Sequence, residues 1–157
     1  MKKSIRPVAA LLCLVFLASL LTSCRKNPSD TQSFQAVAKE LGYNVYDITD
    51  QYTNAEVIRT ATVAAPENRA FQIEFYILTD KENAKKLYLA QGEILDNEQG
   101  SNEKGSVENG RNYAKRVKKS AGRYAVIAYV ENTILYVPPT DAENEEAIKK
   151  FLKRFNY

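Results

Sequence analysis

The sequence predicts an α+β fold: one antiparallel sheet with helices mostly on one of its faces. Three observations support this class. Apolar residues that alternate with polar ones predict strands, most clearly at residues 71–78. Apolar residues spaced three and four apart predict helices. Runs of strands precede each helix instead of alternating with helices one by one, which is typical of an antiparallel sheet.

The first predicted helix follows a short polar segment at residues 25–32. Its apolar positions fit a helical period, with Ser33 expected as the N-cap and Gly42 as the stop. These positions are Phe34, Val37, Ala38 and Leu41. The segments expected next are a short strand at 43–48, a loop at 49–55, a strand at 57–64, a turn at 66–68 and a strand at 71–78.

A capping box, Thr79-Asp80-Lys81-Glu82, predicts the start of the second helix. Its expected inward stripe is Ala84, Leu87, Tyr88, Gln91, Ile94 and Leu95. Gly92 weakens this helix by about 1 kcal/mol relative to alanine. Residues 96–110 follow, with three glycines and a single aliphatic residue, and we expect them to form a flexible loop.

The second half of the chain predicts strands at 112–119, 123–130 and 133–137, with Pro138-Pro139 ending the sheet pairing. Thr140-Asp141-Ala142-Glu143 is a second capping box. It opens a last helix with the apolar stripe Ile148, Phe151, Leu152 and Phe155. The boxes at 79–83 and 140–144 match in four of five positions. The chain therefore reads either as two β-hairpin–helix halves behind an N-terminal helix, or as two unrelated helix starts that use the same residue types.

The N-terminus has the layout of a secretory signal peptide. Basic residues occupy positions 2, 3 and 6, and an apolar run follows at 8–21. About 14 apolar residues give about 21 Å of helix, which is short for a bilayer core of about 30 Å.

The end of this run, Leu21-Thr22-Ser23-Cys24, resembles the lipobox of bacterial lipoproteins. That resemblance implies a diacylglyceryl group on the sulfur of Cys24, palmitate-type acylation, and removal of residues 1–23. It gives a lipidated cysteine with a tether at 24–32 and a single domain at 33–157, anchored to the cell membrane on its extracytoplasmic side. The alternative is an ordinary secretory leader in which Cys24 has no special role.

The composition excludes several functions. The net charge of +3 comes from 22 basic and 19 acidic residues, and the three basic residues of the leader account for it. The rest of the chain is neutral, so nucleic acid is not an expected partner. The chain has no histidine, and Cys24 is its one cysteine outside the leader. We therefore expect no disulfide, no catalytic thiol, no metal site and no cofactor.

A basic run is the main candidate for a surface contact. It consists of Arg111, Lys115, Arg116, Lys118, Lys119 and Arg123. On a strand, Lys115 and Lys119 would share one face, and Arg116 and Lys118 the other. The run could face anionic lipids or wall polymers. The favoured alternative is a solvated edge strand that its lysines protect against aggregation.

Tyrosines and acidic residues are two further candidates for a site. Ten tyrosines could stack on a glycan or a peptide, although strand positions favour tyrosine in any case. Asp47, Asp50 and Glu74 are the acids expected near strand ends, but no spacing marks two of them as a glycosidase pair.

The mature chain is similar to small lipoproteins of Gram-positive gut-type bacteria for which no activity is known. The similar features are Gly42-Tyr43, the 129–136 hairpin and the terminal helix. We predict a non-enzymatic binding domain for a protein, a peptide or an envelope component. An accessory subunit of an envelope complex is the alternative, and a small hydrolase is less favoured. The oligomeric state stays open.

Overall fold

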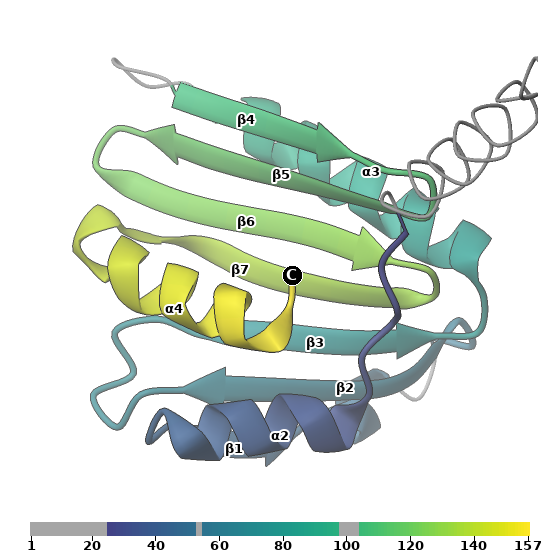
Figure 1. The fold of residues 1–157 in the computed structure, drawn as a ribbon, viewed down its shortest axis with the longest axis horizontal. Helices are drawn as coiled ribbons and strands as arrows, with labels where there is room; N and C mark the ends of the chain where they lie inside the picture. The colour runs from purple at the N-terminus through teal and green to yellow at the C-terminus, as the bar shows by residue number, and fades with distance from the viewer. Residues whose placement is uncertain (1–24, 53–54, 98–103) are drawn as a thin grey trace, which may run out of the picture.

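The computed structural model describes residues 25–52, 55–97 and 104–157, which form a seven-stranded antiparallel sheet and three α-helices (Figure 1). The strands are β1 (Asn44–Asp47), β2 (Ile58–Ala65), β3 (Ile73–Leu78), β4 (Lys104–Asn109), β5 (Tyr113–Ser120), β6 (Arg123–Val130) and β7 (Thr133–Asp141). The helices are α2 (Thr31–Glu40), α3 (Lys81–Asn97) and α4 (Glu145–Phe155), with short 3₁₀ turns η1 (Thr49–Tyr52) and η2 (Ala142–Asn144). The predicted α+β class and antiparallel sheet are confirmed.

The strand order is β1-β2-β3-β7-β6-β5-β4, and every neighbouring pair is antiparallel. Helices α2 and α4 cover one face of this sheet, and α3 lies on the other (Figure 1). We call these the α2–α4 face and the α3 face. In β3, Ile73 and Phe75 point to the α2–α4 face, whereas Tyr76 and Leu78 point to the α3 face. The central strands are therefore buried on both sides.

The chain contains two strand–helix halves that meet where β3 pairs with β7. The first half is β1–β3 followed by α3, and the second is β4–β7 followed by α4. A two-fold axis that exchanged the antiparallel neighbours β3 and β7 would run perpendicular to the sheet, so it would leave both helices on the same face. Because α3 and α4 lie on opposite faces, the order of elements repeats but the placement of the helix does not.

The helix starts differ from the predicted ones by short shifts. Helix α2 is capped by Asp30, not Ser33: the Asp30 Oδ1 accepts a hydrogen bond from the Ser33 N–H at 2.7 Å. Helix α3 is capped by Asp80, one residue after Thr79, with its Oδ1 2.8 Å from the Asn83 backbone nitrogen. In both cases an aspartate competes with a nearby hydroxyl for the same role, and both residue types are good N-caps. Gly42, at φ 76°, ends α2 as predicted.

The second predicted capping box does not cap a helix. Strand β7 continues through Pro138-Pro139 to Asp141, and Thr140 pairs with Tyr124. The sheet tolerates both prolines because they fall where the β6–β7 register is irregular, between the pairs Val126–Val137 and Tyr124–Thr140. Helix α4 then starts at Glu145 without a side-chain cap.

The flexible loop predicted at 96–110 is shorter than expected. Helix α3 extends to Asn97, and Lys104–Asn109 forms β4, which pairs with β5 in register; residues 98–103 lie outside the described residues. The side chain of Val107 remains 56 % exposed. Backbone hydrogen bonds to β5, not apolar burial, therefore hold β4, and composition gave no sign of it.

The segment predicted as a tether, 24–32, contacts the domain at Arg25 and Lys26. The side chain of Asn112, which is 2 % exposed, accepts a hydrogen bond from the Lys26 N–H at 3.1 Å and donates one to the Lys26 carbonyl at 2.7 Å. Arg25 pairs with Glu131 at 3.4 Å. This segment is consequently fixed to the end of the sheet where β5 begins.

The predicted leader and the predicted lipid carrier, Cys24, lie outside the described residues. Among the helices that are described, none has the length and apolar character required to cross a membrane.

Candidate functional site

The α3 face is only partly covered by its helix. Helix α3 lies over β6 and its neighbours, where the Tyr88 ring meets the Tyr129 ring edge-on at 5.2 Å. Over β1 and β2, η1 is the one helical element of the described residues on this face, and two hollows open beside it. They measure about 600 Å³ and about 220 Å³, and both are lined by Tyr52 and Glu74. We call the two adjoining hollows the α3-face groove.

One cross-strand row of side chains runs through the groove. Successive pairs in the sheet register join β1 to β2, β2 to β3, β3 to β7 and β7 to β6. The members of the row are Tyr46, Val63, Glu74, Tyr136 and Ile127. Because directly opposed residues of an antiparallel sheet point to the same side, residues far apart in the sequence line one surface.

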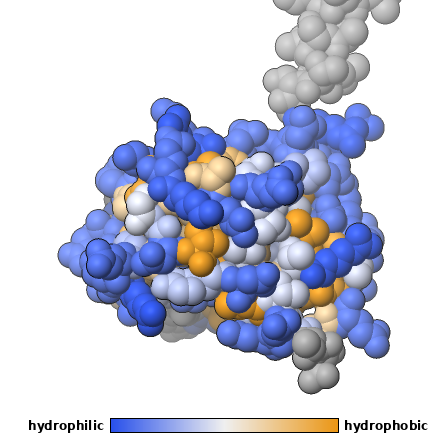
Figure 2. All heavy atoms as spheres, turned by 90° about the horizontal axis from the view of Figure 1, so that it is seen from below, coloured by the Kyte–Doolittle hydropathy of each residue, from blue (hydrophilic) through white to orange (hydrophobic). Residues whose placement is uncertain are grey.

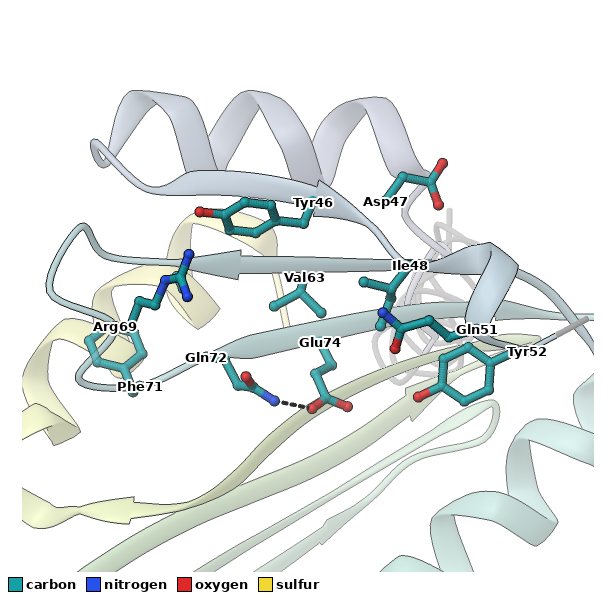
Figure 3. Close-up of a pocket in the computed structure, with 11 residues that line it drawn as sticks. Tyr46, Asp47, Ile48, Gln51, Tyr52, Val63, Arg69, Phe71, Gln72 and Glu74 are labelled. Carbon is teal, nitrogen blue, oxygen red and sulfur yellow. Dashed lines mark hydrogen bonds between the residues drawn. The ribbon is translucent and has the colours of Figure 1, made fainter.

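The larger hollow is polar and lies over β1–β3 (Figure 3). Tyr46 from β1 and Tyr52 from η1 stand at its two ends, with Val63 and Glu74 on the sheet between them. Arg69, at φ 52° in the β2–β3 turn, holds its guanidinium carbon 5.9 Å from the centre of the Tyr46 ring. This hollow therefore offers aromatic rings, a carboxylate and a cation to a ligand.

The turn η1 is fixed to β2, and this fixes the position of Tyr52. The Thr49 hydroxyl accepts a hydrogen bond from the Ala61 N–H at 2.9 Å, and the Ile48 N–H donates to the Ala61 carbonyl at 2.9 Å. The segment predicted as a loop at 49–55 thus begins with an ordered turn that forms one wall of the groove.

The smaller hollow is mostly apolar and reaches α3. Four aliphatic residues line it, together with Tyr52, Tyr76, Tyr136, Gln91 and Glu74. The aliphatic residues are Ile58, Leu87, Ile127 and Ile134. A ligand group that enters this hollow leaves water and contacts an apolar surface. The hollow therefore favours apolar ligand groups.

Glu74 lies where the two hollows meet, and its carboxylate is held by neighbouring side chains. Gln72 Nε2 donates a hydrogen bond to Oε1 at 2.6 Å, and the Tyr76 hydroxyl donates to Oε2. The hydroxyls of Tyr52 and Tyr76 are 3.1 Å apart, and their rings meet edge-on at 5.7 Å. Burial, followed by the hydrogen bond to Glu74, raises the pKa of Tyr76 far above its usual range. Tyr76 therefore stays neutral and donates to the carboxylate.

The predicted acids do not form a catalytic pair. Asp47 and Glu74 line the same hollow, but the Asp47 carboxylate points away from Glu74 (Figure 3). Hydrogen bonds from Thr49 lower the pKa of Asp47, so this side chain is an ordinary ionised surface acid. Asp50 is exposed on η1 and is not part of the groove lining. The described ranges also contain no group of three or more histidine, cysteine, aspartate or glutamate residues that could hold a metal.

The predicted basic run is not one patch. The register confirms that Lys115 and Lys119 share the α2–α4 face of β5, and Arg116 and Lys118 the α3 face. Strand β5 lies between β4 and β6, so the interpretation as an edge strand is wrong. Arg111 precedes the start of β5 and Arg123 follows its end.

Several of these basic side chains bind neighbouring elements. Lys119 forms an ion pair with Glu145 of α4 at 2.6 Å, and Arg116 forms one with Asp96 of α3 at 2.6 Å. Lys115 Nζ lies 3.2 Å from the Tyr157 carbonyl oxygen, and burial lowers its pKa. The run therefore connects helices to the sheet on both faces.

Gly92 leaves room on α3 for the Arg116 guanidinium. A Cβ atom at Gly92 would lie 2.7 Å from a terminal nitrogen of Arg116. The guanidinium passes over the helix at this position, and its central carbon is 5.8 Å from the Tyr88 ring centre. The buried stripe of α3 is accordingly Ala84, Tyr88, Gly92 and Leu95, whereas Ile94, which was predicted to point inward, is 54 % exposed.

Sequence reasoning considered Glu74 and the tyrosines separately and did not combine them. One available signal was the alternation in β3, which puts Glu74 and Tyr76 on the opposite side from Ile73 and Phe75. The contributions of Tyr46 and Tyr136 depend on strand register, which the local sequence does not encode.

Comparisons with known proteins give little further information. A scan of protein-family models and a search of curated proteins found no match. Among solved structures, the chain is similar to a GTP-binding regulator from Thermotoga maritima, with a TM-score of 0.47 and 20% sequence identity. The similarity covers 81% of this chain and 87% of the other.

Proposed function

We propose that this chain is a lipid-anchored, extracytoplasmic binding domain that holds a protein, a peptide or an envelope component in the α3-face groove. The observation that carries the proposal is the groove itself. The uncovered part of the α3 face combines two hollows, several tyrosines and a carboxylate held in place by hydrogen bonds.

The groove suits binding because its polar groups are already oriented. Gln72 and Tyr76 fix the Glu74 carboxylate, so a ligand need not order it on binding. The surrounding rings supply contact area at small entropic cost. Seen from the side of α2 and β1, the surface is mostly hydrophilic with separate hydrophobic spots (Figure 2). This side therefore offers local contacts rather than a broad apolar interface.

The anchoring part of the proposal rests on the sequence around Leu21-Thr22-Ser23-Cys24. Changing Cys24→Ala is expected to abolish acylation, because the thiol is the acceptor, and to release the protein from the membrane fraction. Metabolic labelling with radioactive palmitate and membrane fractionation measure both effects. A Cys24→Ala protein that still incorporated palmitate would contradict the assignment.

The binding part is tested by photo-crosslinking in the cell that makes the protein. A photoreactive amino acid replaces Tyr46, which is 42 % exposed in the groove, or Lys150, which is exposed on α4. We expect adducts from position 46 and none from position 150. Adducts from position 150 alone would instead indicate an accessory subunit that docks through its helices, and would contradict the groove as the ligand site.

A further inference from the structure

Three acidic side chains in the described part of the chain are half-buried, and all of the others are exposed. They are Glu74, Glu131 and Glu145. Glu131 faces two cations, Arg25 at 3.4 Å and Lys81 at 3.7 Å. Glu145 also faces two, Lys119 at 2.6 Å and Lys149 at 2.8 Å.

Glu74 differs from the other two. It receives hydrogen bonds from Gln72 and Tyr76, both neutral, and within the described ranges it forms no ion pair. Withdrawing a carboxylate from water is unfavourable unless an opposite charge or several hydrogen bonds compensate. Glu131 and Glu145 are compensated by charges of the protein, whereas Glu74 leaves part of its hydrogen-bonding capacity and all of its charge available to a ligand.

The surroundings of Glu74 also favour a positive charge. Tyr52, Tyr76 and Tyr136 line the smaller hollow with it, and Tyr46 lines the larger one. The face of a tyrosine ring attracts cations. Two tyrosine rings on this face of the sheet already hold a cation of the protein, because the guanidinium of Arg69 lies over Tyr46 and that of Arg116 over Tyr88.

The apolar part of the groove indicates the rest of the ligand. The hollow of about 220 Å³ next to Glu74 is lined by aliphatic residues, among them Ile58, Leu87 and Ile134. A hydrated inorganic ion gains nothing from such a surface, whereas an ammonium group that carries hydrocarbon can bury the hydrocarbon there.

We propose that the α3-face groove binds an organic cation: an ammonium group pairs with the Glu74 carboxylate among the tyrosine rings, and its attached hydrocarbon enters the smaller hollow. This inference names the ligand chemistry of the proposed binding site and rests on that site being functional. The same chemistry occurs in the lysine side chain of a peptide and in a choline-type headgroup.

The test measures binding to the full acylated chain in a neutral detergent by isothermal titration calorimetry. The probes are Nα-acetyl-lysine amide and choline. Their uncharged counterparts of nearly the same shape are Nα-acetyl-norleucine amide and 3,3-dimethylbutan-1-ol. We expect at least one cation to bind at least tenfold more tightly than its counterpart. Tighter binding of the lysine derivative would identify a peptide as the source, and tighter binding of choline would identify a headgroup.

Two variants locate the binding. Glu74→Gln keeps the size of the side chain and removes its charge, and it should weaken cation binding at least tenfold. Glu93→Gln, at an exposed acid on α3, should leave binding unchanged. If Glu74→Gln does not fold by circular dichroism, Tyr52→Leu serves instead, because it keeps an apolar side chain but removes a ring and should also weaken the binding of the cation.

The inference is overturned if the neutral counterparts bind as tightly as the cations, if a folded Glu74→Gln protein retains full affinity, or if neither cation binds. The crosslinking result at position 46 separates these failures from failure of the proposed function. Adducts at position 46 together with no cation binding would leave the groove as a ligand site and exclude this ligand class. If position 46 gave no adducts and neither cation bound, the groove would be rejected as a ligand site.

Discussion

The two faces of the sheet differ in how much phenylalanine they contain. Every phenylalanine of the described ranges packs on the α2–α4 face: Phe34, Phe71, Phe75, Phe151 and Phe155. The α2–α4 face also buries Tyr124 and Tyr157. The buried aromatic residues of the α3 face are all tyrosines, namely Tyr76, Tyr88 and Tyr129. Its groove is lined by Tyr46, Tyr52 and Tyr136, with Phe71 at the wall of the larger hollow. In a closed layer a ring hydroxyl needs a protein partner, as the buried Tyr157 hydroxyl has in Thr133, whereas a ring at a half-open surface can keep its polar end in contact with water or a ligand.

The difference follows from how much of each face a helix covers. On the α2–α4 face, two helices bring their own rings, and Phe34 is fully buried against Phe75 at 5.3 Å, Phe151 at 5.3 Å and Phe155 at 5.5 Å. On the α3 face a single helix covers one half. Both faces bury an apolar cluster, the larger one lies on the α2–α4 face, and the α3 face also carries the candidate site.

The largest expected effect is on the α2–α4 face. Phe34→Ala removes the ring around which α2, β3 and α4 pack and should lower the free energy of unfolding by about 3–5 kcal/mol. Urea denaturation followed by circular dichroism measures it. A loss below about 1 kcal/mol would contradict the view that Phe34 is central to the packing of this face.

Adding a hydroxyl to a buried ring of the α2–α4 face should give the next largest effect on stability. Phe75→Tyr places a hydroxyl in a fully buried layer of rings and should cost about 1–3 kcal/mol. The reverse change on the open face, Tyr46→Phe, should stay within about 0.5 kcal/mol, since that side chain is 42 % exposed. Equal costs measured by urea denaturation would mean that the choice of tyrosine or phenylalanine does not reflect coverage.

The smallest expected effect on stability comes from Glu145, the half-buried acid at the start of α4. Hydrogen bonds from Lys119 and Lys149 lower the pKa of Glu145 below that of the unfolded chain. Its contribution to stability is therefore fully present above the unfolded value of about 4.3 and disappears as the pH falls through the lower folded pKa. Glu145→Gln should reduce the loss of stability between pH 7 and pH 3 by less than about 1 kcal/mol. Denaturation of both proteins at the two pH values measures it, and an identical pH dependence would show that the pair contributes nothing.

The α2–α4 face could be predicted from the sequence and the α3-face groove could not. Helical spacing located Phe34, Ile148 and Phe151, and alternation located Ile73 and Phe75, because each of these patterns is local. The groove combines Tyr46, Glu74 and Tyr136, which become neighbours only through the register of β1, β2, β3 and β7. Strand β4 was missed for a related reason, since backbone pairing and not side-chain burial holds it.

The reciprocal hydrogen bonds between Asn112 and Lys26 shorten the segment that is free to extend between Cys24 and the domain. A free nine-residue linker at 24–32 would reach about 30 Å when extended, whereas the two residues from Cys24 to Lys26 reach about 7 Å. With a lipid on Cys24, the beginning of β5 would be held close to the bilayer surface. The short connection would then keep the whole domain near the membrane surface instead of letting it extend away from it.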